Sequence, residues 1–172
     1  KDDGHGGLWI ATYNRILHKS SEDGIPTIPS ALAEKSEFIN KSIMSLASNP
    51  SELWLGYRAA GVQRFSFETN ELTSFGTDTT NPLSSNAASC MLLLDSGVSV
   101  VGTYGGGVNL IVRTGEVSIL RNETESLTSL GRFLVMLYQA RDKTIWVGTE
   151  GGLFQLDTYN LSLIPQPIEE KP

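Results

Sequence analysis

The sequence is poor in cysteine, in histidine and in long apolar runs, and each shortage excludes a class of protein. A single cysteine, Cys90, excludes an intrachain disulfide. Two histidines, His5 and His18, with no cysteine pair supply too few ligands for a zinc site. The longest apolar runs, Cys90–Leu94 and Phe133–Tyr138, are far shorter than the roughly 20 residues that cross a bilayer. We therefore expect no metal, no other cofactor and no insertion of this segment into a membrane.

Positive charge is also scarce. Lys and Arg number 13 against 19 Asp and Glu, which gives a net charge of -6. Because an acidic surface does not attract phosphate backbones, we expect no nucleic-acid partner. Residues 1–25 lack the basic start and apolar block of a signal peptide. The 172 residues are 40% hydrophobic and 19% charged, a composition typical of a globular domain with a core.

A repeat is the strongest signal in the sequence. The phrases LWIAT, LWLGY, VSVVGT and TIWVGT centre on Trp9, Trp54, Val100 and Trp146, at spacings of 45, 46 and 46 residues. A small residue stands two positions after each of these anchors, and a Gly-rich turn follows the last three. Four copies in one register indicate a structural repeat.

Each repeat unit contains four short apolar segments separated by turns rich in Gly, Asn and Asp. No stretch keeps a helical period over 11 residues, and for the best helix candidate, Ser30–Phe38, we expect a loop or a single turn. Four antiparallel strands in about 46 residues are typical of one β-propeller blade. The sequence therefore predicts an all-β protein, a β-propeller fragment of about four four-stranded antiparallel blades.

The approximate blades are residues 1–30, 40–76, 86–121 and 131–164, followed by a Pro-rich tail at 165–172. The first begins inside the turn before its second strand, so we expect it to lack its first strand. The Trp anchors should fill the space between blades, with local repacking at the smaller Val100. An arc of four blades leaves apolar faces bare. The remaining blades of a larger ring, a second copy of the chain, or closure as a four-bladed ring would each cover them.

The segments Ser42–Phe65, Ala87–Ile111 and Arg132–Asp157 resemble the two-component regulator propeller repeat: an apolar strand, a turn, LWIGT, GGGL and another apolar strand. The run NPLSSN also resembles a motif of that family. The departures are Tyr57 for Thr, Val100 for Trp, and the missing Gly turn of the first copy.

This resemblance implies the periplasmic sensor half of a bacterial membrane receptor, whose cytoplasmic output half is a histidine kinase or a GGDEF diguanylate cyclase. The chain has neither a kinase His box nor a GGDEF sequence. We therefore expect a non-enzymatic segment that binds a ligand and passes the signal to a separate output domain.

Four residues stand at the same repeat position, four after each anchor: Tyr13, Arg58, Tyr104 and Glu150. They belong to the loops between second and third strands, which should surround the central axis on one face. Tyrosine rings suit sugar faces and Arg58 suits a carboxylate, so the candidate ligands are a sugar, a peptide or a small acid. The alternative interpretation is that the four are ordinary solvated loop residues with no binding function.

Two other functions remain open. One is a protein-interaction scaffold, although the Gly-His and Trp-Asp marks of WD repeats are missing. The other is a glycosidase-like propeller enzyme, since Ala140–Trp146 loosely resembles a sialidase Asp box. That box braces a turn, however, and a glycosidase needs two carboxylates at fixed separation, whereas Glu150 is the only acid among the four loop positions. The run Gly105–Gly107 lacks the Lys of a phosphate-binding loop and indicates a hairpin turn.

Overall fold

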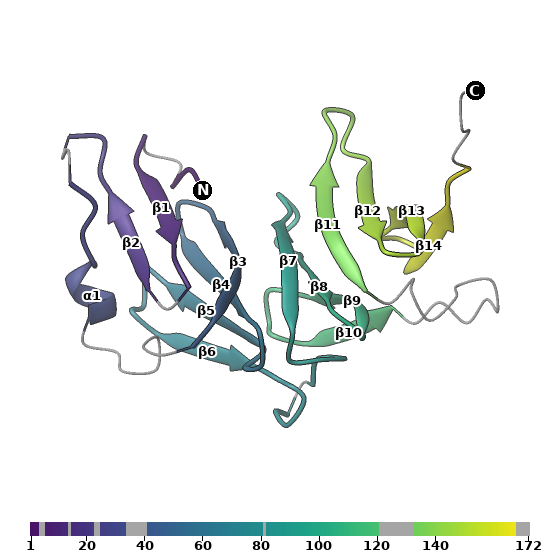
Figure 1. The fold of residues 1–172 in the computed structure, drawn as a ribbon, viewed down its shortest axis with the longest axis horizontal. Helices are drawn as coiled ribbons and strands as arrows, with labels where there is room; N and C mark the ends of the chain where they lie inside the picture. Colours follow the sequence, from purple (N-terminus) through teal and green to yellow (C-terminus); the bar gives the residue numbers. More distant parts are fainter. Residues whose placement is uncertain are drawn as a thin grey trace.

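The computed structural model of the chain describes residues 1–3, 6–13, 15–22, 25–33, 41–80, 82–120 and 133–167. These residues form fourteen β-strands and one helical turn, arranged as one two-stranded and three four-stranded antiparallel sheets (Figure 1). Within every sheet the strands lie in chain order, each hydrogen-bonded to the next. The prediction of a β-propeller fragment with about four blades is confirmed.

We call the sheets the first to fourth blades in chain order. The first blade contains β1 (Leu8–Ala11) and β2 (Ile16–Lys19), and the second contains β3 (Ile43–Ser48), β4 (Glu52–Tyr57), β5 (Val62–Ser66) and β6 (Leu72–Phe75). The third blade contains β7 (Ala88–Leu93), β8 (Ser99–Thr103), β9 (Gly107–Ile111) and β10 (Val117–Leu120). The fourth blade contains β11 (Leu134–Gln139), β12 (Ile145–Thr149), β13 (Gly152–Asp157) and β14 (Ser162–Pro165).

The helical turn α1 (Ser30–Ala33) lies where the sequence predicts a loop or a single turn. The rest of that candidate helix, residues 34–38, lies outside the described residues. In the described part of the chain, no helix is long and apolar enough to cross a membrane.

In the first blade, short contacts extend the two-stranded sheet on both sides. Asp2 forms an isolated antiparallel bridge with Leu8, and His18 forms another with Thr27. The Trp9 amide donates a 2.8 Å hydrogen bond to the carbonyl of Lys1. Four segments of chain therefore lie side by side here, although only two of them form full strands.

The three four-stranded blades share the same local irregularity. The pairing of the first strand with the second shifts register between Ile43 and Ser45, between Ala88 and Cys90, and between Leu134 and Met136. A bulge at the same repeat position in each blade shows that the three blades are copies of one structural unit.

The first strands of neighbouring blades lie beside one another along the inner edge of the arc, since β3 contacts β7 and β7 contacts β11. Serine hydroxyls join them. Ser45 Oγ donates a 2.8 Å hydrogen bond to the Ala88 carbonyl, and Ser89 Oγ donates a 2.6 Å hydrogen bond to the Leu134 carbonyl. A serine side chain of the innermost strand thus attaches the second blade to the third, and another attaches the third blade to the fourth.

Side chains that alternate along each second strand face opposite neighbouring blades. On β4, Leu53 packs toward the first blade in a cluster with Trp9, whereas Trp54 packs toward the third blade in a cluster with Val101. Trp54 is 2% exposed, and its ring stacks on Phe75 with 5.7 Å between centroids. The expectation that the Trp anchors fill the space between blades is confirmed for Trp9 and Trp54.

Val100 occupies the anchor position of the third blade and is fully buried. It belongs to a cluster with Leu110 of its own blade and Ile145 and Leu156 of the fourth, and Leu92 packs against the same cluster. Aliphatic side chains from both blades therefore occupy the space that an indole occupies between the other blades. This is the local repacking that the sequence predicts.

The fourth blade has one covered face and one open face. We define the open face as Met136, Tyr138, Trp146 and Ile164, which lie on the same side of the sheet because they share register or alternate along a strand. Tyr138 is 55% exposed and Met136 50%, whereas the equivalent side of β4 is covered by the third blade. Figure 1 shows the first and fourth blades at opposite ends of an open arc, so the described part of the chain does not close into a four-bladed ring.

Candidate functional site

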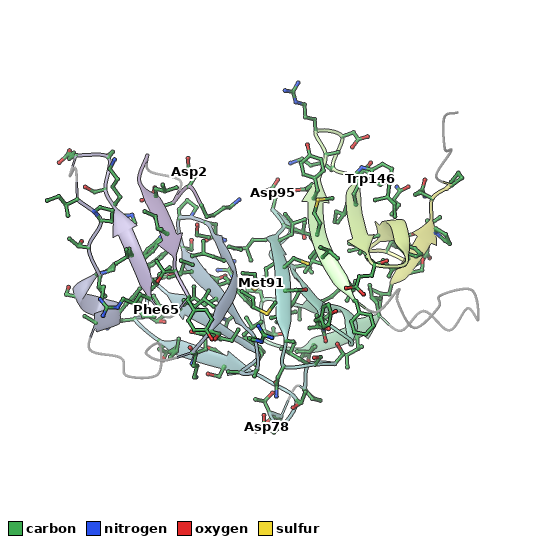
Figure 2. All side chains as sticks on the ribbon, in the orientation of Figure 1. Asp2, Phe65, Asp78, Met91, Asp95 and Trp146 are labelled. Atoms are coloured by element: carbon green, nitrogen blue, oxygen red, sulfur yellow. The ribbon has the colours of Figure 1, made fainter. Side chains whose placement is uncertain are left out.

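The turns of the blades lie on two opposite faces of the arc. One face carries the turns between second and third strands (residues 12–13 and 15, 58–61, 104–106, 150–151) and the connection 76–80 and 82–87. We call it the loop face. The hairpin face has the turns between first and second strands (49–51, 94–98, 140–144) and between third and fourth strands (67–71, 112–116, 158–161). Figure 2 shows Asp2 and Asp95 toward the hairpin face and Asp78 at the opposite end of the strands.

The loop-face candidates of the three four-stranded blades are held in the same way. In each, the backbone amide donates to the carbonyl of the residue that precedes the first strand. The hydrogen bonds run from Arg58 to Ser42 (2.9 Å), from Tyr104 to Ala87 (2.8 Å) and from Glu150 to Phe133 (3.1 Å). Because the first strands form the inner edge of the arc, the backbones of these three candidates lie beside that edge.

The structure brings two of the candidates, Tyr104 and Glu150, into direct contact. The Tyr104 hydroxyl donates a 3.0 Å hydrogen bond to Glu150 Oε1, across the junction between the third and fourth blades. The neighbouring carboxylate favours the neutral phenol and raises the pKa of Tyr104 above its ordinary value. The Tyr104 ring also lies against Phe133, with 4.4 Å between ring centroids. The result is a positioned phenol–carboxylate pair, of which Tyr104 is 46% exposed.

The other two candidates, Tyr13 and Arg58, are exposed but separate. Tyr13 is 73% exposed, and its carbonyl accepts a 3.0 Å hydrogen bond from the Ile43 amide. Neither side chain forms a hydrogen bond or an ion pair with another described residue. The predicted set of four is therefore in contact only at Tyr104 and Glu150.

A buried polar network beneath the Tyr104 loop was not predicted from the sequence. The Asn109 side chain is fully buried, where its Oδ1 accepts from the Ser84 amide (2.8 Å) and its Nδ2 donates to Ser84 Oγ (2.8 Å). Ser84 Oγ is also 3.0 Å from Thr103 Oγ1, and Ser85 Oγ donates to the Tyr104 carbonyl (3.1 Å). An asparagine inside the otherwise apolar strand 107–111 was the available signal. The network fixes the backbone of the Tyr104 loop.

Tyr57, which departs from the family pattern, belongs to the core. Its ring is fully buried, and its hydroxyl donates a 2.7 Å hydrogen bond to Gln63 Oε1, which is also buried. Burial raises the pKa of Tyr57 far above its ordinary value. This tyrosine therefore packs the junction with the first blade and takes no part in a loop-face site.

Within the described ranges, no three His, Cys, Asp or Glu side chains are grouped to hold a metal ion. His18 bonds instead to the Asp3 carboxylate through Nε2, at 2.7 Å, and its ring lies 4.5 Å from that of Trp9. It therefore contributes to the packing of the first blade.

No protein-family model and no curated protein matches the chain. Solved structures do match. The extracellular domain of the hybrid two-component system BT4673 from B. thetaiotaomicron aligns with 92% of the chain, at a TM-score of 0.73 and 23% identity. The extracellular domain of BT3049, also from B. thetaiotaomicron, aligns with 92% of the chain, at a TM-score of 0.72 and 17% identity. A streptogramin B lyase aligns with 90% of the chain, at a TM-score of 0.65 and 12% identity.

These likenesses define the chain as a β-propeller segment. It spans only 20% and 22% of the two sensor-domain chains and 49% of the lyase chain. The two extracellular domains come from the class of protein that the repeat resembles, and neither is described as an enzyme. Both are described as parts of hybrid two-component systems, so a diguanylate cyclase output gains no support.

Proposed function

We propose that this chain is part of the extracytoplasmic, ligand-sensing propeller of a bacterial signal-transduction receptor. The observation that carries the proposal is the likeness, over 92% of the chain, to extracellular domains of hybrid two-component systems. The resemblance to the two-component regulator propeller repeat supports the same class. In this proposal the propeller binds its ligand in the periplasm and passes the signal to a separate cytoplasmic output domain. The chain itself performs no reaction.

The ligand binds on the loop face, over Tyr13, Arg58, Tyr104 and Glu150. The Tyr104–Glu150 pair supplies a flat ring beside hydrogen-bond acceptors, and Arg58 supplies a cation that forms two parallel bonds to a carboxylate. These groups suit a sugar, a peptide or a small acid. Their backbones are fixed by hydrogen bonds to the first strands, so little ordering is required when the ligand binds.

A thermal-shift screen of sugars, peptides and small acids on the intact propeller tests this proposal. A ligand that binds only the native state stabilises it by about 2.7 kcal/mol at 100 times its Kd, so a saturable rise in Tm is expected. Tyr104→Phe and Glu150→Gln should each weaken binding about tenfold, through the loss of a hydrogen bond to the ligand. Tyr159→Phe and Glu68→Gln, exposed positions on the hairpin face, are matched controls that should bind as the unmodified protein does.

Four results would contradict direct ligand sensing at this face. One is the failure of every compound in a broad library to shift Tm, and another is equal weakening by the control variants. A macromolecular partner captured without any small ligand would favour the interaction scaffold instead. Turnover that disappears in Glu150→Gln would favour a propeller enzyme.

We also infer that a further blade of the same repeat covers the open face of the fourth blade. The support is the exposure of Met136, Tyr138 and Ile164 at a position where the second and third blades are covered, together with the greater length of the sensor-domain chains. A cysteine introduced as Met136→Cys should react quickly with a maleimide in the 172-residue chain and slowly in a longer protein that contains it.

Tyr159→Cys is the control for this labelling, because Tyr159 is 92% exposed on the hairpin face and should react in both proteins. If Met136→Cys reacts equally fast in the longer protein, no further blade covers the open face. If it is protected in the 172-residue chain only at high concentration, a second copy covers the face in that chain.

A further inference from the structure

A groove of about 580 Å³ opens on the hairpin face between the second and third blades. Its walls include the turn 49–51 and Glu52 of the second blade, residues 93–95 of the third, and two arginines, Arg64 on β5 and Arg113 in the β9–β10 turn. The volume lies in the range of small-molecule sites. The groove shares no residue with the loop-face site, so an inference about it does not depend on the proposed function.

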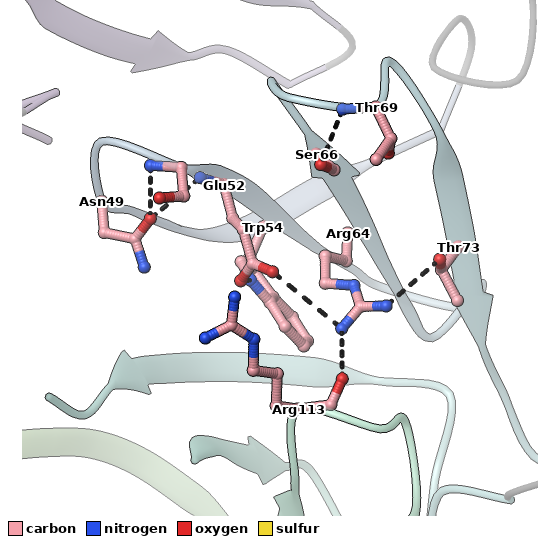
Figure 3. A network of polar contacts seen from close by, with 9 residues as sticks. Asn49, Glu52, Trp54, Arg64, Ser66, Thr69, Thr73 and Arg113 are labelled. Carbon is pink, nitrogen blue, oxygen red and sulfur yellow. Dashed lines mark hydrogen bonds and ion pairs between the residues drawn. The ribbon is translucent and has the colours of Figure 1, made fainter. Parts of the chain in front are cut away.

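Arg64 is held in a fixed orientation in the wall of this groove (Figure 3). Its guanidinium lies over the Trp54 ring, 5.7 Å from the centroid, and donates to the Arg113 carbonyl at 3.3 Å. Glu52 Oε1 lies 4.0 Å from Arg64 Nη1, while Glu52 Oε2 accepts a 2.9 Å hydrogen bond from Trp54 Nε1. A guanidinium has five N–H donors, and these contacts with a long bond to Thr73 (3.5 Å) leave some for a ligand.

Arg113 supplies a second guanidinium, and Lys1 also lines the groove. Figure 3 shows its side chain extending from the β9–β10 turn toward Trp54 and Glu52. The residue is exposed, and its guanidinium forms no hydrogen bond or ion pair with another described residue. Its backbone carbonyl is the acceptor for Arg64, so the turn is held in place independently of the Arg113 side chain.

The acidic residues of the groove limit the charge of a ligand. Asp2, Glu52 and Asp95 all line it. Asp95 is already paired with Lys143, at 2.8 Å, and Glu52 with Arg64. A phosphate dianion would meet repulsion from these carboxylates, whereas a single carboxylate carries less charge and matches the planar fork of a guanidinium.

We propose that this groove binds a ligand that carries one carboxylate, with the carboxylate held by Arg113 and Arg64. The ligand is an acidic sugar or a simple organic acid, and the same recognition serves both. Arg64 is the positioned donor and Arg113 is the group that becomes ordered on binding.

Isothermal titration of the full-length protein with glucuronate, propionate, glucose and inorganic phosphate tests the proposal. Glucuronate should bind and glucose should not, since the two differ in the carboxylate. Binding of propionate at the same site would identify simple organic acids as ligands, and its failure would identify acidic sugars. Affinity should fall as ionic strength rises, because the pair is partly exposed.

Arg113→Gln should weaken glucuronate binding at least about tenfold, since a hydrogen-bonded charge pair is lost. Arg141→Gln is the matched control: it removes the same charge from an exposed arginine in another turn of the hairpin face and should change the affinity less than about twofold. Arg64→Lys keeps the charge but loses the planar fork, and should also weaken binding.

The proposal is overturned if neither carboxylate binds, if Arg113→Gln leaves the affinity unchanged, or if Arg141→Gln weakens binding as much as Arg113→Gln. Phosphate binding as tight as glucuronate binding would equally overturn the assignment to a single carboxylate. None of these results bears on Tyr104→Phe or Glu150→Gln, so failure here is distinguishable from failure of the loop-face site.

Discussion

Replacement of Trp54 by alanine should destabilise the chain severely, whereas the same replacement at Trp146 should not. The two residues occupy the same repeat position and differ in what covers them. Trp54 is 2% exposed, stacks on Phe75 and donates its indole N–H to Glu52. Trp146 lies on the open face of the fourth blade and is only partly buried.

Loss of a buried tryptophan side chain costs about 3–5 kcal/mol, which includes the cavity left behind. For a chain of this length that corresponds to a decrease in Tm of about 6–20 °C. Trp146→Ala should cost less, about 1–2 kcal/mol, because no blade covers the open face and part of the Trp146 ring already lies in water. Urea unfolding of the 172-residue chain, followed by far-UV circular dichroism, measures both free energies without relying on tryptophan fluorescence.

Equal destabilisation by the two variants in this chain would refute the assignment of Trp54 to a covered junction and Trp146 to an open face. In a longer protein whose next blade covers the open face, Trp146→Ala should become as costly as Trp54→Ala. The pair of variants therefore reports on the burial of each anchor separately.

Three further predictions follow from contacts already described. A Cβ at Gly102 would overlap the Cys90 sulfur, so Gly102→Ala should lower the free energy of unfolding by about 1–3 kcal/mol. At the equivalent Gly148, the atom nearest to an added Cβ is 3.5 Å away, so Gly148→Ala should be nearly neutral. Urea titration measures both effects. Burial raises the pKa of Cys90 to about 11, so at pH 8 the native thiol should react with iodoacetamide far more slowly than the urea-unfolded thiol, and equal rates would contradict this. Deprotonation of Tyr104 would place two negative charges side by side, so its phenol should ionise at higher pH than a free tyrosine. Glu150→Gln should lower the pH midpoint of this ionisation in an NMR titration of the ring, and an unchanged midpoint would disprove the contact.

The repeat was enough to predict the blades and the burial of three of their four anchors. Trp9, Trp54 and Val100 recur at one position of a unit whose strands alternate between two faces, and that periodicity determines which side chains meet the next blade. For Tyr104 and Glu150, the sequence predicted a shared repeat position but not the contact between them. Whether two side chains from different blades touch depends on their rotamers and on the local packing against Phe133, which spacing does not specify.

The groove on the hairpin face could not be predicted from the sequence at all. Arg64 stands in the middle of a strand, where a charged residue indicates only a partly exposed position. Its role depends on Trp54 beneath it and on the carbonyl of Arg113, 49 residues away in the next blade. A groove lined by residues from two repeats at different repeat positions leaves no mark in a single repeat.

The serine hydroxyls along the inner edge have a mechanical consequence. They join β3 to β7 and β7 to β11 at the narrow side of the arc, through single bonds and not through a continuous ladder. Such an attachment resists separation of the blades at that edge, and we expect it to permit a small rotation of one blade against the next. We expect a molecule that binds across the Tyr104–Glu150 contact to turn the fourth blade slightly against the third about this edge. The wide outer edge of the arc would then move farther than the bound molecule does.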